Sequence, residues 1–165
     1  MDLRKIIDQE NIRAELVALQ SEALIRQQAV RNEELAKIWA AFVQHFEPFP
    51  EFTLTTTEHE IRATYLQSNI IMVEDPSATV KEMPLSVGVK IIMPTAVEYK
   101  ISTVYDTLQQ EKTTVALTYR LSEGEKKILL LKRFISGEFV FTFQYRTKFR
   151  IKPYETMDEV LSIIN

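Results

Sequence analysis

The feature that most constrains the fold of this chain is its first 47 residues, which contain neither glycine nor proline. Ala, Leu, Glu, Gln and Arg dominate this segment, and these residues favour an α-helix. Pro48 and Pro50 then end it, because proline lacks an N–H and restricts the residue before it. A helix over residues 2–46 would be about 65 Å long at 1.5 Å per residue. Such a helix must bend, break or project from a compact domain.

The apolar residues of this helical segment form two stripes. The first has a 4-3-4 spacing and consists of Ile12, Leu16, Leu19 and Ala23. The second is richer and consists of Leu35, Ile38, Trp39, Phe42, Val43 and Phe46. The segment 26–34 between them is almost wholly polar, and the stripes are out of register across it. We expect the second stripe to cover a sheet, with Trp39 and Phe42 buried.

The first stripe has no obvious partner within a small domain. One interpretation places both stripes on the same sheet. The other is a coiled-coil-like contact with a second copy of the chain through Ile12, Leu16, Leu19 and Ala23. We favour the contact with a second copy, which predicts a homo-oligomer.

From Phe52 onward the apolar pattern alternates with a period of two, as in strands with one buried and one wetter face. The expected strands, clearest in the last three, span 52–57, 60–66, 69–73, 85–93, 97–105 and 114–121. Turns are expected at 122–125 and at Ser136-Gly137, and short spacers of this kind favour a meander over βαβ units. After Pro153, Thr156 is a plausible N-cap for a final short helix.

These patterns predict the α+β class: a long N-terminal amphipathic helix packed on a curved, mostly antiparallel meander sheet, followed by a short C-terminal helix. We expect a single domain over residues 1–165. Its predicted parts are a helical region at 1–47, an antiparallel β region at 51–152 and a C-terminal helix at 155–164.

Composition excludes several classes of protein. The chain has no cysteine, which excludes a disulfide framework and any thiolate metal site. No apolar run approaches the roughly 20 residues that a membrane-spanning helix needs. The first residues, MDLRKIIDQEN, lack the apolar stretch of a signal peptide. We therefore expect a soluble cytoplasmic protein without a membrane partner.

The sequence carries no catalytic or cofactor signature. A serine nucleophile would need a base, and only His45 and His59 are available. The three glycines lie too far apart for a phosphate-binding loop. On a strand, Glu58 and Glu60 would face away from His59, so the three would not converge on a metal ion. We expect no cofactor and no metal, and a non-enzymatic protein rather than an enzyme.

Basic residues gather late in the chain, where residues 120–152 hold nine Lys or Arg against three Glu. Over 138–152 the apolar and aromatic residues fall mostly on odd positions, which predicts one long strand with an aromatic face. Its other face would carry a row of cations about 7 Å apart, near the spacing of nucleic-acid phosphates. These cations are Arg146, Lys148, Arg150 and Lys152. A preceding strand with Lys126, Lys127, Lys132 and Arg133 would widen the patch.

This patch has two interpretations: a polyanion-binding surface, or a solvated edge strand protected from aggregation by its charges. We favour the edge strand, since single-strand binders place exposed rings beside their cations and here the rings would lie on the opposite face. The leading hypothesis is therefore a non-enzymatic interaction or assembly protein that self-associates through its N-terminal helix. Its alternatives are a nucleic-acid or polyanion binder, and a binder of a small apolar ligand between sheet and helix.

Overall fold

The computed structural model describes residues 2–106 and 118–164, which form two compact units. One, named here the helical unit, is built from the described residues of Met1–Ala29 and Asp106–Thr142. The other, the sheet unit, is built from those of Val30–Tyr105 and Phe143–Asn165. Whether both units fold as the single domain predicted over 1–165 stays a prediction.

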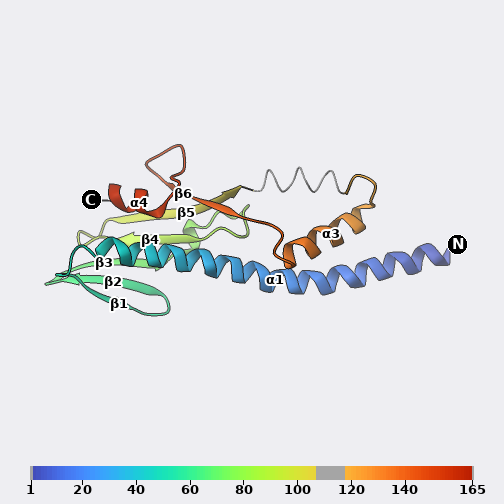
Figure 1. Cartoon of the computed structure of the whole chain (residues 1–165), viewed down its shortest axis with the longest axis horizontal. Helices are drawn as coiled ribbons and strands as arrows, with labels where there is room; N and C mark the ends of the chain where they lie inside the picture. Colours follow the sequence, from blue (N-terminus) through green and yellow to red (C-terminus); the bar gives the residue numbers. More distant parts are fainter. Residues whose placement is uncertain (1, 107–117, 165) are drawn as a thin grey trace. The chain divides into compact units, whose positions relative to one another are not determined.

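The long N-terminal helix is confirmed as α1 (Leu3–Phe46), a continuous helix of 44 residues (Figure 1). The polar segment 26–34 does not break it, and it ends just before Pro48. Its first part belongs to the helical unit and its second part, from Val30, to the sheet unit.

The sheet is a six-stranded antiparallel meander that is not closed, in the order β1-β2-β3-β4-β5-β6. The strands are β1 (Thr53–Thr56), β2 (Glu60–Tyr65), β3 (Ser68–Glu74), β4 (Gly88–Ile92), β5 (Glu98–Asp106) and β6 (Thr142–Thr147). The 3-10 helix η1 (Pro76–Ala78) follows β3 and is capped by the Asp75 side chain. The register sets Ile61 opposite Met72, Met72 opposite Ile91, and Ile91 opposite Tyr99. Because paired residues share a face, these four form one apolar row across β2 to β5.

The core of the sheet unit lies where α1 and α4 (Met157–Ile163) cover this row. Ile38 and Phe42 of α1 are each 1% exposed, and Met157, Val160 and Leu161 of α4 are buried. Phe42 is thus buried as predicted, whereas Trp39 packs against the core and is only partly buried. The predicted C-terminal helix is confirmed, since Thr156 caps α4 by accepting a hydrogen bond from the Glu159 amide at 3.3 Å.

The predicted β region 51–152 is wrong in its later part, because residues 123–135 form a helix, α3 (Glu123–Ile135). Lys126, Lys127, Lys132 and Arg133 therefore lie on a helix and not on a strand. Ser122 caps α3 in a reciprocal capping box with Glu125, a pattern that the sequence analysis read as a hairpin turn. Gly137 has the expected positive φ of 79°, but it follows the last turn of α3 and does not form a hairpin.

The two other strand predictions in this region also need correction. Of the predicted strand 114–121, residues 114–117 lie outside the described residues and 118–121 form no strand. The predicted strand 138–152 shrinks to β6. Before β6, Phe139 and Phe141 pack on Phe134 of α3 at ring-centroid distances of 6.4 and 6.1 Å. After β6 the chain turns back on itself.

Within residues 2–106 and 118–164, none of the helices combines the length and apolar character that crossing a bilayer requires.

Removal of the Phe42 ring tests the docking of α1 on the sheet. We expect Phe42→Ala to lower the unfolding free energy by about 3–5 kcal/mol, the usual cost of truncating a buried aromatic side chain. Urea unfolding followed by the fluorescence of Trp39, the single tryptophan of the chain, measures this change. Phe49→Ala is the control, because Phe49 is 51% exposed. Equal stability of the two variants would contradict the docking.

Candidate functional site

The predicted oligomer stripe lies on the helical unit, where α3 packs beside it. Ile12, Leu16, Leu19 and Ala23 are all half-buried. A Cβ atom added to Gly124 would come within 2.7 Å of Ile12 Cγ2, so α3 begins in direct contact with this stripe. Ile128 and Leu129 of α3 line the same pocket as Ile12. The half-burial of the stripe therefore has a source within the chain, and its contact with a second copy stays a prediction.

Contacts along the two helices show that α3 runs in the same direction as this part of α1. Ile12 lies at Gly124, Glu15 Oε1 accepts Lys132 Nζ at 2.6 Å, and the Arg26 guanidinium lies near Gly137. Positions therefore increase together on both helices. Even so, none of the residues of α3 is fully buried. Among the described residues of the helical unit, α1 and α3 thus leave large apolar side chains exposed.

The opposite side of α1 in the helical unit carries a second apolar surface that the sequence analysis missed. We name it the open stripe, and it consists of Leu3, Ile7, Val17, Leu24 and Ile25, which are 58–73% exposed. At 100° per residue, its members lie about 110–170° around the helix from the centre of the stripe that faces α3. Its signal was present in the sequence, because Leu3, Ile7, Val17 and Leu24 fit a 4-3 repeat, whose other positions are Glu10, Ala14 and Ser21.

The predicted row of cations is not formed. Arg146 is on β6, but Lys148, Arg150 and Lys152 lie beyond its end, in the loop that joins β6 to α4. All four are exposed. The regular 7 Å spacing required one extended strand over these residues, so that part of the polyanion argument is wrong. Polyanion binding itself stays a prediction.

Two tyrosines close the base of this loop. The amide of Tyr145 donates to the Tyr154 carbonyl at 2.9 Å, and the amide of Tyr154 donates back to the Tyr145 carbonyl at 2.7 Å. Both side chains are largely buried. In addition, the Arg150 guanidinium carbon lies 4.5 Å from the centre of the Tyr154 ring. The loop is therefore attached to the core at both of its ends.

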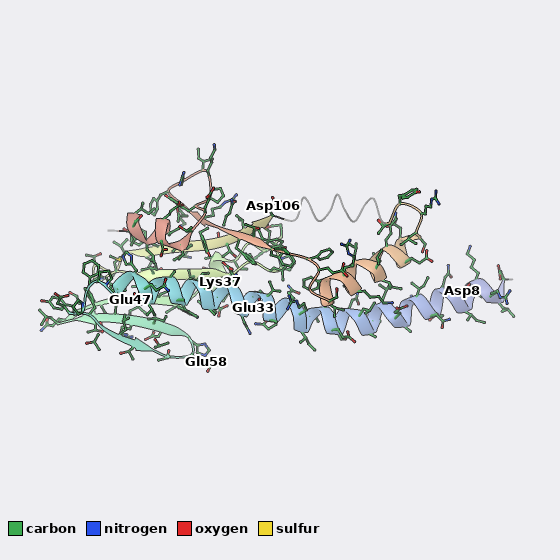
Figure 2. The ribbon with its side chains drawn as sticks, viewed as in Figure 1. Asp8, Glu33, Lys37, Glu47, Glu58 and Asp106 are labelled. Carbon is green, nitrogen blue, oxygen red and sulfur yellow. The ribbon has the colours of Figure 1, made fainter. Side chains whose placement is uncertain are left out.

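Glu34 of α1 forms a hydrogen bond with one of these two tyrosines. Its carboxylate is buried and accepts a hydrogen bond from the Tyr145 hydroxyl at 2.7 Å. Lys37, about one turn further along α1 (Figure 2), places Nζ 3.5 Å from Glu34 Oε2 and is mostly exposed. Burial, and then the hydrogen bond to the Glu34 carboxylate, raise the pKa of Tyr145. The sequence analysis missed this pair, because Glu34 looks like one more residue of a polar segment.

A pocket of about 480 Å³ lies beside the loop, and its lining is mainly apolar. It is lined by Tyr99, Lys100, Thr147, Phe149, Tyr154, Ile163 and Ile164. It therefore lies among β5, the end of β6, the loop and α4, whereas the interface of α1 with the sheet is filled by core side chains. Binding of a small apolar ligand between sheet and helix stays a prediction.

The residues considered for catalysis or metal binding are not brought together. His59 and Glu58 form an exposed pair at 3.8 Å, in the segment between β1 and β2. His45 is exposed near the end of α1, and its ring lies edge-on to Phe46. Throughout the part of the chain that the structure describes, no three His, Asp or Glu residues are grouped so that they could hold a metal ion.

Comparison of the chain with protein-family models, with curated proteins and with solved structures finds no match.

The buried pair of Tyr145 and Glu34 can be tested by removing one hydroxyl group. We expect Tyr145→Phe to lower the unfolding free energy by about 1–3 kcal/mol, because Glu34 loses its buried donor. A raised folded-state pKa contributes stability that is fully present below the unfolded value of 10.0 and is lost as pH rises above it. The variant should therefore lose less stability above pH 10 than the parent.

Urea unfolding between pH 7 and 11 measures both effects. Glu34→Gln is the matched control, since its amide oxygen still accepts the Tyr145 hydroxyl and the lost pairing with exposed Lys37 is worth little. An unchanged stability of Tyr145→Phe at pH 7 would show that the hydrogen bond contributes nothing.

Proposed function

We propose that this chain is an assembly protein whose helical unit binds a second copy of itself through the open stripe. The observation that carries the proposal is the exposure of Leu3, Ile7, Val17, Leu24 and Ile25 along one side of α1. Apolar side chains at a 4-3 spacing are typical of a helix that packs against another helix. The other side of α1 is already in contact with α3 at Ile12.

The size of this surface supports a stable contact. Complete burial of a Leu, Ile or Val side chain contributes about 1.5–3 kcal/mol, so each residue of the open stripe, being about 60% exposed, can contribute about 1–2 kcal/mol. A symmetric contact uses the stripe twice. The resulting total of about 10–20 kcal/mol is comparable with or larger than the about 4–15 kcal/mol that association costs.

Small residues in the middle of the stripe favour a close helix pair. Ala14, Ala18 and Ser21 are exposed and lie between Ile7 and Leu24 on this side of α1. They would allow two helix backbones to approach. An antiparallel arrangement fits best, because a parallel one would set the exposed Glu10 against Glu10 of the second copy. Such a pair has the twofold symmetry that is commonest among homo-oligomers.

Charges placed in the open stripe should dissociate the assembly and leave the fold intact. We expect the parent chain to have about twice its mass of 19.2 kDa at tens of micromolar, and Val17→Asp with Leu24→Asp to be monomeric with an unchanged helical circular dichroism signal. Size-exclusion chromatography with light scattering measures the mass. The matched control is Gln9→Asp with Gln20→Asp, two exposed residues of α1 outside both stripes.

Leu16→Asp separates the two sides of the helix. Because Leu16 lies on the side of α1 that faces α3, we expect this variant to weaken the helical unit and to lose helical signal. If instead Leu16→Asp were folded and monomeric while the open-stripe variant remained a dimer, the proposed face would be wrong. A parent chain that is monomeric at 200 µM would overturn the proposal entirely.

A further inference from the structure

The loop between β6 and α4 presents an unusual combination of side chains, which lies outside the proposed assembly contact. Its tip is the segment Lys148-Phe149-Arg150-Ile151-Lys152. Ile151 is 97% exposed and Phe149 is 70% exposed. Figure 1 shows this loop extending away from β6 and α4. Together, two large exposed apolar side chains that alternate with three cations form one surface that can bind a partner.

The tip is held by its base. The paired backbones of Tyr145 and Tyr154 close the loop, and the Tyr145 hydroxyl is bonded to Glu34 inside the core. The Phe149 ring lies 5.8 Å from the Tyr99 ring, and Arg150 lies over Tyr154. Ile151 is in none of these contacts. The tip is therefore presented on a supported base, which reduces the ordering cost of binding.

The charge of the tip is positive. Lys148, Arg150 and Lys152 carry three charges within five residues, and all three are exposed. Among the described residues, the ion pairs of Lys and Arg in the sheet unit involve other cations, namely Arg31, Lys37, Arg62, Lys90 and Lys100. Glu155 and Glu159 line a pocket with Arg150 and Lys152 on the α4 side of the loop, and both glutamates are exposed.

We infer that this tip binds the surface of an anionic lipid bilayer. Ile151 and Phe149 would enter the boundary between headgroups and acyl chains, while Lys148, Arg150 and Lys152 remain among the anionic headgroups. Alternating apolar and basic side chains on a short loop provide apolar insertion and attraction to anionic headgroups at one place. A single-stranded nucleic acid fits less well, because the most exposed apolar side chain of the tip, Ile151, offers no ring for a base to stack on.

This contact differs from a membrane-spanning segment. The sequence analysis expected no membrane partner because no stretch of the chain is long enough to cross a bilayer, and a surface contact needs no such stretch. On the predicted strand, Phe149 and Ile151 belonged to the buried face. The turn of the chain after Thr147 is what brings them into solvent beside the cations.

Vesicle co-sedimentation of the full chain tests the inference. We expect binding to phosphatidylcholine vesicles containing 30% phosphatidylserine, little binding to pure phosphatidylcholine, and release in 0.5 M NaCl through screening. Lys148→Gln with Lys152→Gln should weaken binding about 30-fold, from about 5-fold for each cation near an anionic surface. Phe149→Ser with Ile151→Ser should weaken it at least as much.

Leu66→Ser is the matched control, because Leu66 is 82% exposed in the turn between β2 and β3 and its immediate neighbours, Tyr65 and Gln67, are uncharged. It should bind vesicles like the parent chain. Urea unfolding by Trp39 fluorescence shows that each variant is folded. Absence of parent binding to anionic vesicles would overturn the inference, and so would an equal loss in Leu66→Ser. Retardation of mixed-sequence RNA without vesicle binding would reassign the tip to nucleic acid.

Discussion

The packing of the sheet unit depends on one row of α1 side chains. They are spaced four residues apart and are buried in the core of that unit. The row consists of Val30, Glu34, Ile38, Phe42 and Phe46. Four of its members are apolar and fill the core. The fifth is a carboxylate, which is tolerated in this position because the Tyr145 hydroxyl donates to it at 2.7 Å. That hydrogen bond connects the C-terminal part of α1 to β6, and β6 leads directly into the loop between β6 and α4. The same hydrogen bond thus contributes to the packing of the core and to the position of the loop.

In the helical unit α1 meets a different demand. The side that bears Ile12 contacts α3, and the open stripe on the opposite side remains in water. Two packed helices such as α1 and α3 bury only the faces that they share. The proposed assembly would bury the open stripe against a second copy of α1.

A helix could be predicted from the sequence where its residue pattern was long, as in α1. The prediction failed where the pattern was short, as in α3. The absence of Gly and Pro before Pro48 was sufficient for α1, and alternation located β5 within a residue or two. Residues 123–135 were misread, although Ser122 and Glu125 form a capping box, because the turn-like Ser-Glu-Gly-Glu was given more weight than the cap. For 138–152, the alternation of aromatic and basic residues continues beyond Thr147, where β6 ends. The backbone pairing of Tyr145 with Tyr154 turns the chain back on itself there, and the alternation does not show this pairing.

The sequence by itself determined the class of fold, the long helix, the antiparallel order of the strands and the capped C-terminal helix, because these depend on local periodicity and on proline and glycine. Only the tertiary structure decided that the stripe containing Ile12, and not the open stripe, faces α3. It also decided that Glu34 is buried and that Phe149 and Ile151 are exposed. Each of these depends on a contact between residues far apart in the chain. Periodicity can show that a side chain needs a partner, but it does not show which distant segment reaches it first.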